Sequence, residues 1–159
     1  VRGQGTTFRI RLPLTLAIID GFQVAVGDAV FVIPLDMVVE CSDMSLEEGA
    51  KRLVSLRGEP LPFVRLREVF ALGGEAAARE SLVVVEYGKQ RAGIVVDKLL
   101  GEAQAVIKPL GKLFTGVRGI SGSTIRGDGA VALILDVPGL IDLSVGTGEP
   151  GLPQALPAV

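Results

Sequence analysis

The sequence predicts an all-β protein in which two five-stranded barrels are fused, and three observations lead to this prediction. The composition is 48% hydrophobic and only 4% aromatic, with 21 glycines in 159 residues, which favours short aliphatic strands separated by turns. A pattern at 24–36 recurs at 85–97, and in each copy an aspartate follows a turn glycine. About five short strands fit each copy, and closing them into a barrel removes exposed sheet edges.

The first copy begins with a hairpin around Gly27-Asp28, where glycine supplies the positive φ of a tight turn. Pro34 interrupts the ladder, a bend or helical turn follows at Asp36, and polar residues 43–51 predict a surface connection. A turn at 58–60 separates the last two strands, and one or two helical turns follow at 65–70. The expected strands of this copy are 22–26, 29–33, 38–41, 54–57 and 61–64.

The second copy repeats this order, with Gly88 at the place of Gly27 and Gly127 at the place of Gly58. The separation is larger for the second pair of glycines, which places an insertion in the connection at 109–119, after a bend expected at 97–100. The expected strands are 82–87, 91–96, 102–107 and the two arms of 123–135 around a Gly-Asp-Gly turn. The predicted organisation is 1–18 as the end of a preceding domain with a connector, 19–74 as the first barrel, 75–143 as the second barrel and 144–159 as a flexible, Pro- and Gly-rich tail.

The residue types argue against several classes of function. The chain has no histidine and a single cysteine, Cys41, so serine–histidine and cysteine–histidine nucleophile systems are excluded and no metal-ligand cluster is evident. The net charge is −2 without a basic stripe, so nucleic acid is not expected as a partner. No run of about 20 apolar residues suggests a membrane span, and we expect a soluble, cytoplasmic, non-enzymatic chain.

Binding through apolar sheet surfaces remains as the expected activity. Residues 30–33 and 94–96 are apolar without alternation, so the other copy or a partner must cover part of these strands. Val38 and Leu99 each follow the repeated aspartate by two positions, and they are either core residues or partner contacts. Glu40 and Arg57 have opposite charges at strand ends, where they can pair.

Several motifs together resemble one protein family. The run 3–18, with Gly3-x-Gly5-Thr, resembles the end of the ATP-binding domain of the chemotaxis histidine kinase CheA where it passes into the C-terminal regulatory domain. The rest of the chain to residue 143 resembles the CheW-like fold of that regulatory domain. The motifs that carry the resemblance are Leu-Arg-Gly-Glu-Pro-Leu-Pro at 56–62, Gly-Ile-Val-Val-Asp at 93–97, Leu-Leu-Gly at 99–101 and Ile-Arg-Gly-Asp-Gly at 125–129.

The resemblance implies two barrels like Src-homology-3 domains that dock the adaptor CheW and the cytoplasmic tips of chemoreceptors. In that family the outer end of one barrel binds a CheW barrel, and the groove between the barrels faces the receptor. The positions of this chain that correspond to partner contacts are Phe22, Val38, Glu40, Arg57, Leu99 and Glu102.

The resemblance also limits what this chain does alone. Gly3 and Gly5 resemble only the last nucleotide-binding box of the kinase, so we expect no ATP binding or hydrolysis and no cofactor. The parent chain is expected to be a histidine kinase that dimerises through a domain outside this sequence and works at chemoreceptor arrays. The alternative is a stand-alone CheW-type scaffold adaptor, although such an adaptor has no reason to carry the Gly-x-Gly-Thr strand.

Overall fold

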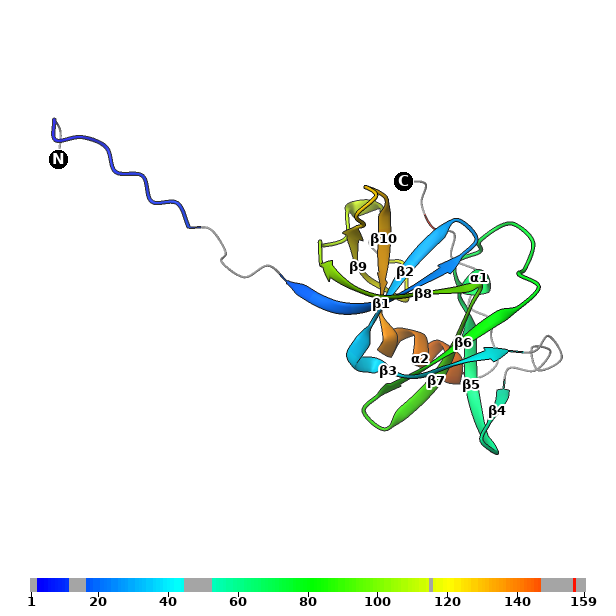
Figure 1. The fold of residues 1–159 in the computed structure, drawn as a ribbon. Helices are drawn as coiled ribbons and strands as arrows, with labels where there is room; N and C mark the ends of the chain where they lie inside the picture. The colour runs from blue at the N-terminus through cyan, green and yellow to red at the C-terminus, as the bar shows by residue number, and fades with distance from the viewer. Residues whose placement is uncertain (1–2, 12–16, 45–52, 115, 147–155, 157–159) are drawn as a thin grey trace.

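Two five-stranded sheets, each curled into a small barrel, make up the body of the protein in a computed structural model (Figure 1). The structure describes residues 3–11, 17–44, 53–114, 116–146 and 156. The strands in these ranges are β1 (Ile18–Val26), β2 (Ala29–Pro34), β3 (Val38–Met44), β4 (Leu53–Leu56), β5 (Glu59–Arg65), β6 (Glu80–Tyr87), β7 (Gln90–Val96), β8 (Lys98–Val106), β9 (Ile120–Ile125) and β10 (Val131–Leu135). The helices are η1 (Leu35–Met37), α1 (Leu66–Val69), η3 (Lys112–Phe114) and α2 (Val137–Val145).

The strands divide between the barrels in an order that the sequence did not predict. Barrel A has the order β8-β1-β2-β10-β9, and barrel B has the order β3-β6-β7-β5-β4. Barrel B is therefore one continuous segment, 38–96, which lies between β2 and β8 of barrel A. Barrel A is closed where Lys108 and Ser123 exchange backbone hydrogen bonds of 2.8 and 3.0 Å.

The predicted boundary near Gly74, with one barrel at 19–74 and the other at 75–143, is consequently wrong. β6 and β7 follow residue 75 but pair with strands of the first copy, and β1 and β2 pair with strands of the second. The physical reason lies at η1 and at Asp97, where the chain leaves one barrel and enters the other. The apolar pattern that identified the strands is satisfied by either pairing, because it specifies a buried face and not the strand that covers it.

The internal repeat itself is confirmed by the pairing register. Val24 lies opposite Leu99 in barrel A, and their counterparts in the repeat, Val85 and Val38, lie opposite each other in barrel B. Both ladders also contain a bulge next to these pairs, which leaves Leu100 in one and Val39 in the other without a partner across the strand. Each barrel is therefore made of the first two strands of one copy and the last three strands of the other.

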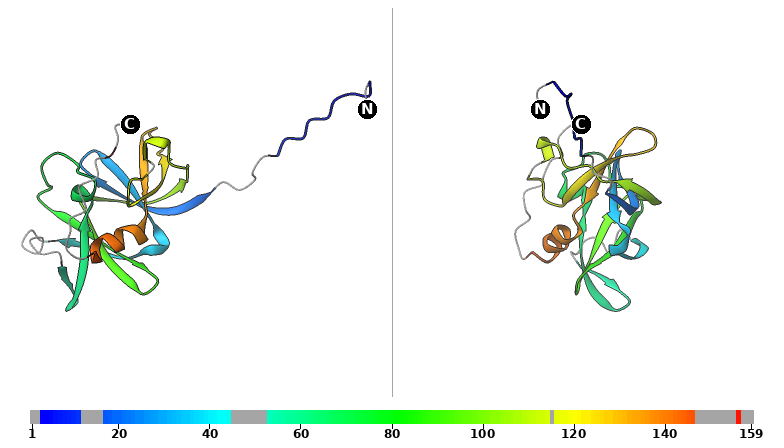
Figure 2. Two further views of the ribbon diagram at one scale, coloured as in Figure 1. Left: turned by 180° about the vertical axis from the view of Figure 1, so that it is seen from behind. Right: turned by 90° about the vertical axis from the view of Figure 1, so that its left-hand side faces the viewer.

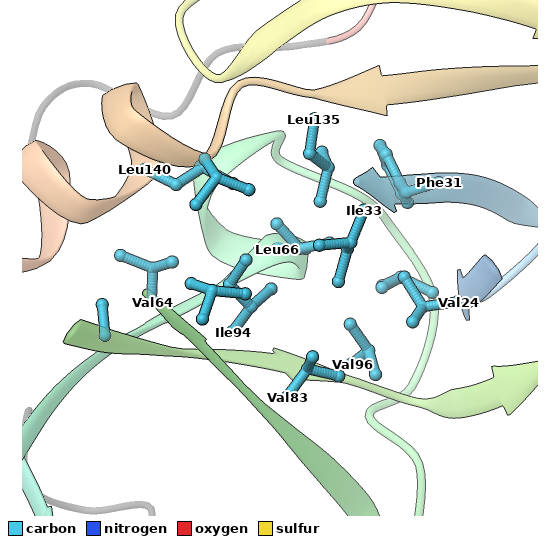
Figure 3. Packing of buried hydrophobic residues seen from close by; sticks show 14 of the residues in the cluster. Val24, Phe31, Ile33, Val64, Leu66, Val83, Ile94, Val96, Leu135 and Leu140 are labelled. Atoms are coloured by element: carbon cyan, nitrogen blue, oxygen red, sulfur yellow. The ribbon is translucent and has the colours of Figure 1, made fainter. Parts of the chain in front are cut away.

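The largest hydrophobic core lies between the barrels and is called the interbarrel core below. Figure 3 shows its side chains converging from both barrels and from the two helices that follow β5 and β10. The residues labelled there are Val24, Phe31, Ile33 and Leu135 of barrel A, Val64, Val83, Ile94 and Val96 of barrel B, and Leu66 and Leu140 of α1 and α2. The apolar runs at 30–33 and 94–96, which lack alternation, are thus partly covered by the other barrel. The sequence predicted that either the other copy or a partner would cover them.

The barrel interiors hold smaller clusters with a complementary choice of side chains. In barrel B, Leu82 fills the space beside Gly93, where an added Cβ would lie 2.5 Å from the leucine Cδ1. In barrel A the positions are reversed, because Val32 fills the space beside Gly21, where an added Cβ would lie 2.3 Å from the valine Cγ1. Gly21 corresponds to Leu82 in the repeat, and Val32 corresponds to Gly93. Each interior therefore reaches close packing with one glycine and one larger residue, but the two positions are exchanged between the barrels.

Three local expectations need correction. β8 begins at Lys98, directly after Asp97, so the bend expected at 97–100 is confined to the aspartate. The Gly-x-Gly-Thr strand is not present among the described residues, because 3–11 form no strand and lie away from the barrels, as the views in Figures 1 and 2 show. The tail at 144–159 is not wholly unpacked, because α2 extends to Val145 and Leu156 packs against the interbarrel core. Other tail residues, 147–155 and 157–159, and residues 45–52, where most of the expected surface connection falls, lie outside the described ranges.

Candidate functional site

The predicted partner contacts fall into two separate groups, and the first is a charged surface at the end of barrel B. Arg57 Nη2 donates a hydrogen bond of 2.5 Å to Glu40 Oε2, which confirms the predicted pair. The arginine side chain is 80% exposed and the glutamate side chain 27% exposed, so water screens the pair and it contributes little to folding stability.

The backbone at Arg57 is unusual for a residue with a side chain. Its φ is 51°, and Gly58 follows with a φ of 87°, so both central residues of the β4–β5 turn have positive φ. This moves the turn from the predicted 58–60 to 57–58. A left-handed arginine costs roughly 1–2 kcal/mol, and a two-residue type I′ hairpin turn requires this conformation at both of its central residues.

Three further charged residues, which the sequence reasoning missed, belong to this surface. Arg91 forms an ion pair with Glu86 across the β6–β7 ladder, and the Glu86 carboxylate raises the pKa of Arg91 through this hydrogen bond and by charge attraction. Glu59 and Glu40 raise the same pKa to a smaller extent. The parallel pairing of β5 with β7 also puts Glu59, the first residue of β5, at the same end of the sheet as Arg91. We name Glu40, Arg57, Glu59, Glu86 and Arg91 the outer-end surface; no local sequence pattern links them, because they come from four strands and a turn.

The second group borders the interbarrel core. Phe22 and Val38 are partly buried against this core, one from barrel A and one from barrel B. Glu102 lies opposite Phe22 in the β1–β8 ladder, and Leu99 lies opposite the buried Val24 with 37% of its surface exposed. Residues that pair across a ladder share a face of the sheet, so all four belong to the side of the barrels that faces the interbarrel core.

Two exposed apolar residues extend this second group. Val39 and Leu100, the bulged residues of the two ladders, are 47% and 46% exposed. The sequence carried a signal for them, since each copy has two consecutive apolar residues, at 38–39 and 99–100, after the repeated aspartate. We name Phe22, Val38, Val39, Leu99, Leu100 and Glu102 the interbarrel surface. Val38 and Phe22 each pack partly against the core and keep part of their surface accessible.

Three other possible features of the described residues are a metal site, a nucleotide contact at Gly3 and Gly5, and a membrane span. Within these ranges, no three His, Cys, Asp or Glu side chains gather where a metal ion would be held. Gly3 and Gly5 are both exposed and have φ values of 89° and 99°, with no other group within 4 Å of an added Cβ. None of the helices in the described part of the chain has the length and apolar character needed to cross a bilayer.

Comparison with known proteins identifies the fold and the relatives of the chain. The chain is 43% identical over 145 residues to the chemotaxis protein CheA of Klebsiella aerogenes, a match that covers 87% of this chain and 22% of the relative. It is also 43% identical over 150 residues to CheA of Salmonella typhimurium, covering 90% of this chain and 22% of that protein. The sensor histidine kinase CheAY of Helicobacter pylori is 38% identical over 148 residues, 89% of this chain and 18% of its own length.

The chain therefore spans about a fifth of the length of these curated relatives. Among solved structures, the scaffolding protein TtCheW from Thermoanaerobacter tengcongensis superimposes with a TM-score of 0.61 at 18% identity, covering 74% of this chain and 88% of TtCheW. This match shows the fold of the two barrels. A family model described as the CheW-like domain matches residues 20–145, and the chain belongs to the CheW-like domain family.

Proposed function

We propose that the chain is the regulatory module of a chemotaxis histidine kinase, in which it docks a CheW adaptor and chemoreceptor tips and couples receptor state to kinase activity. The observation that carries this proposal is the 43% identity to CheA over 87% of the chain. The rival function, a stand-alone adaptor, is supported by the likeness to TtCheW, but at 18% identity that likeness concerns the fold alone.

The separation of the two surfaces supports docking of two partners at once. The outer-end surface is charged and lies at the end of barrel B, whereas the interbarrel surface is largely apolar and takes residues from both barrels. No residue belongs to both, although Val39 of one directly precedes Glu40 of the other in β3, so the two partners are expected to dock on adjoining surfaces. The adaptor is assigned to the outer-end surface, where charge complementarity gives specificity, and the receptor tip to the interbarrel surface.

The assignment of the receptor tip rests on the accessible apolar residues. Leu99, Leu100 and Val39 expose between 37% and 47% of their surface and lie close to the two crossovers between the barrels, at Asp97 and at η1. Exposed aliphatic side chains beside a polar rim, here Glu102, suit an amphipathic helix, which is the form assigned to the docking receptor segment. A buried apolar contact of this kind gives affinity, while the rim restricts the orientation of the partner.

Binding measurements with surface variants test the assignment. We expect Val38→Asp and Leu99→Asp to weaken binding of a receptor-tip fragment, and Arg57→Glu to weaken binding of CheW, in isothermal titration calorimetry. Ile125→Asp is the matched control, because Ile125 is 53% exposed on β9 and lies in neither surface. Circular dichroism establishes that each variant is folded. Parental affinity for the receptor tip in both folded interbarrel variants contradicts the site, and no affinity of the parent for CheW contradicts the function.

A reconstitution experiment separates the kinase module from the adaptor. We expect the chain to restore receptor control of autophosphorylation when it is fused to a CheA kinase core that lacks its own CheW-like region. We expect no restoration when it is added in trans to receptors and intact CheA in place of CheW. Substitution for CheW in trans would establish the adaptor function instead. A fluorescent fusion of the kinase with and without this segment then tests whether the segment directs it to receptor arrays.

A further inference from the structure

A polar cluster that neither surface includes joins the two barrels beside the interbarrel core. Asp97 lies where the chain passes from β7 of barrel B to β8 of barrel A. Its Oδ2 accepts a 2.7 Å hydrogen bond from the backbone N–H of Gly27, in the β1–β2 turn of barrel A. The same oxygen accepts a 2.5 Å hydrogen bond from Nη2 of Arg67, on the α1 helix that follows β5 of barrel B. We name Arg67, Asp97 and Gly27 the clasp.

Both ends of the clasp are anchored to backbone. Arg67 Nη1 donates to the carbonyl oxygens of Gly73 and Gly74 at 2.7 and 3.4 Å, in the connection from α1 to β6. The backbone N–H of Asp97 donates to the carbonyl oxygen of Ala25 in β1 at 3.0 Å. One guanidinium thus connects the α1 segment of barrel B to the first hairpin of barrel A through a single carboxylate.

The pseudo-equivalent side of the molecule lacks this arrangement. Asp36 and Gly88 are the counterparts of Asp97 and Gly27 in the repeat, yet Asp36 is exposed on η1 and forms no ion pair with the described residues. Where 134–141 is aligned with 63–70, the position of Arg67 is taken by Pro138, the second residue of α2, which has no charge to offer. The β1–β2 turn is therefore linked through Asp97 to Arg67 of barrel B, whereas no ion pair of Asp36 with a described residue does the same for the β6–β7 turn around Gly88.

The energetics point to a role in geometry. The side chains of Arg67 and Asp97 are 15% and 11% exposed, and burying such charges removes hydration that their attraction only partly replaces. Arg67 Nε is also buried without a hydrogen-bond partner among the described residues, which costs further free energy. The interbarrel core beside the clasp is apolar, and apolar packing is non-directional, whereas hydrogen bonds to a shared carboxylate are directional.

We propose that Arg67 and Asp97 are positioning residues that fix the orientation of barrel A on barrel B from one side of the interbarrel core. Because the interbarrel surface takes Val38 and Val39 from barrel B and the other residues from barrel A, its shape depends on that orientation. The inference deepens the proposed function and rests on it in one respect: the receptor tip is the partner that contacts both barrels, while the adaptor contacts barrel B alone.

Residual dipolar couplings measured on the intact chain test the orientation directly, without any partner. The variants are Arg67→Ala, Arg67→Lys and Asp97→Asn, in which the amide oxygen still accepts from Gly27 but the charge is lost. Asp36→Asn is the matched control at the pseudo-equivalent position. We expect couplings from both barrels to fit one alignment tensor with the parental orientation in the parent and in Asp36→Asn. Arg67→Ala and Asp97→Asn should need two tensors or a changed orientation, and Arg67→Lys should lie between them and the parent.

The parental orientation in folded Asp97→Asn and Arg67→Ala would overturn the proposal, and if Arg67→Ala fails to fold, Asp97→Asn decides. Binding gives a second readout: receptor-tip affinity should fall about tenfold in Asp97→Asn, while CheW affinity should change by less than about twofold. Equal losses for both partners would indicate general destabilisation and count against positioning. A parent that binds neither partner would refute the proposed function, and the dipolar couplings would then decide the orientation alone.

Discussion

Gly93 provides a quantitative test of the reversed packing in the two barrel interiors. Replacing it by alanine would place a Cβ 2.5 Å from Leu82 Cδ1 and 3.0 Å from Phe63 Cβ. The leucine Cδ1 is the end of a flexible side chain, but Leu82 is only 2% exposed and is enclosed by the barrel B cluster. The Phe63 Cβ is attached directly to the backbone of β5, so relief there requires the strand itself to move.

The expected magnitude follows from this crowding. Gly93→Ala should lower the free energy of unfolding by about 1–3 kcal/mol, as overpacking of a core does. Leu82→Ala alone should lower it by about 2–5 kcal/mol, because it leaves a cavity. In the Leu82→Ala background the new methyl group enters that cavity, so the cost of Gly93→Ala should fall by about 1–2 kcal/mol.

Urea denaturation of the four proteins of this double-mutant cycle measures the coupling. Gly127→Ala is the control, because an added Cβ at Gly127 meets nothing within 4 Å and the residue is not among the positive-φ glycines. Its effect should stay within about 0.5 kcal/mol. Equal costs of Gly93→Ala in the parental and Leu82→Ala backgrounds would refute the packing argument.

Three further predictions concern single residues. Phe70→Ala should lower the free energy of unfolding, measured in urea, by about 3–5 kcal/mol, because Phe70 is fully buried in the interbarrel core. Phe8 is 85% exposed, so Phe8→Ala should change the free energy of unfolding by less than about 0.5 kcal/mol. Similar values for the two variants would be inconsistent with the described core. Arg57→Ala should cost less than about 1 kcal/mol in the same assay because its ion pair with Glu40 is exposed, and a larger loss would show a structural role. Burial raises the pKa of the Cys41 thiol, so less thiolate is present at a given pH. The rate of its alkylation by iodoacetamide should therefore reach half its maximum at a higher pH than the rate for a free cysteine in a peptide. Equal pH midpoints for the protein and the peptide would contradict the raised pKa.

Structural features that depend on local sequence patterns were predictable from the sequence. Alternation and a turn glycine define the β1–β2 hairpin, and the same signal in the second copy defines β6–β7; both hairpins are confirmed. The Glu40–Arg57 ion pair was also predicted, from opposite charges at strand ends of the same copy. The uninterrupted apolar runs at 30–33 and 94–96 correctly indicated strands that are covered on both faces.

The exchange of strands between the copies was not predictable, because nothing in the residues at Asp36 or Asp97 states which barrel the chain enters next. The clasp was hidden for a related reason. Asp97 stood out as a repeated aspartate, but its partner Arg67 lies far away in the sequence, in a helical turn where an arginine is ordinarily a solvated residue. Only the placement of α1 beside the crossover brings the two charges together, and Pro138 removes the symmetry that would have revealed a pattern.

The insertion of barrel B into barrel A has a consequence for how the molecule comes apart. Two crossovers, at η1 and at Asp97, join the barrels, so a protease that cuts one of them leaves the other intact. After a cut at η1, the β1–β2 hairpin would still be held by backbone hydrogen bonds to β8 and β10 and by the apolar contacts of the interbarrel core. A nicked chain should therefore migrate as a single species until denaturant is added, and neither barrel is released by a single cleavage.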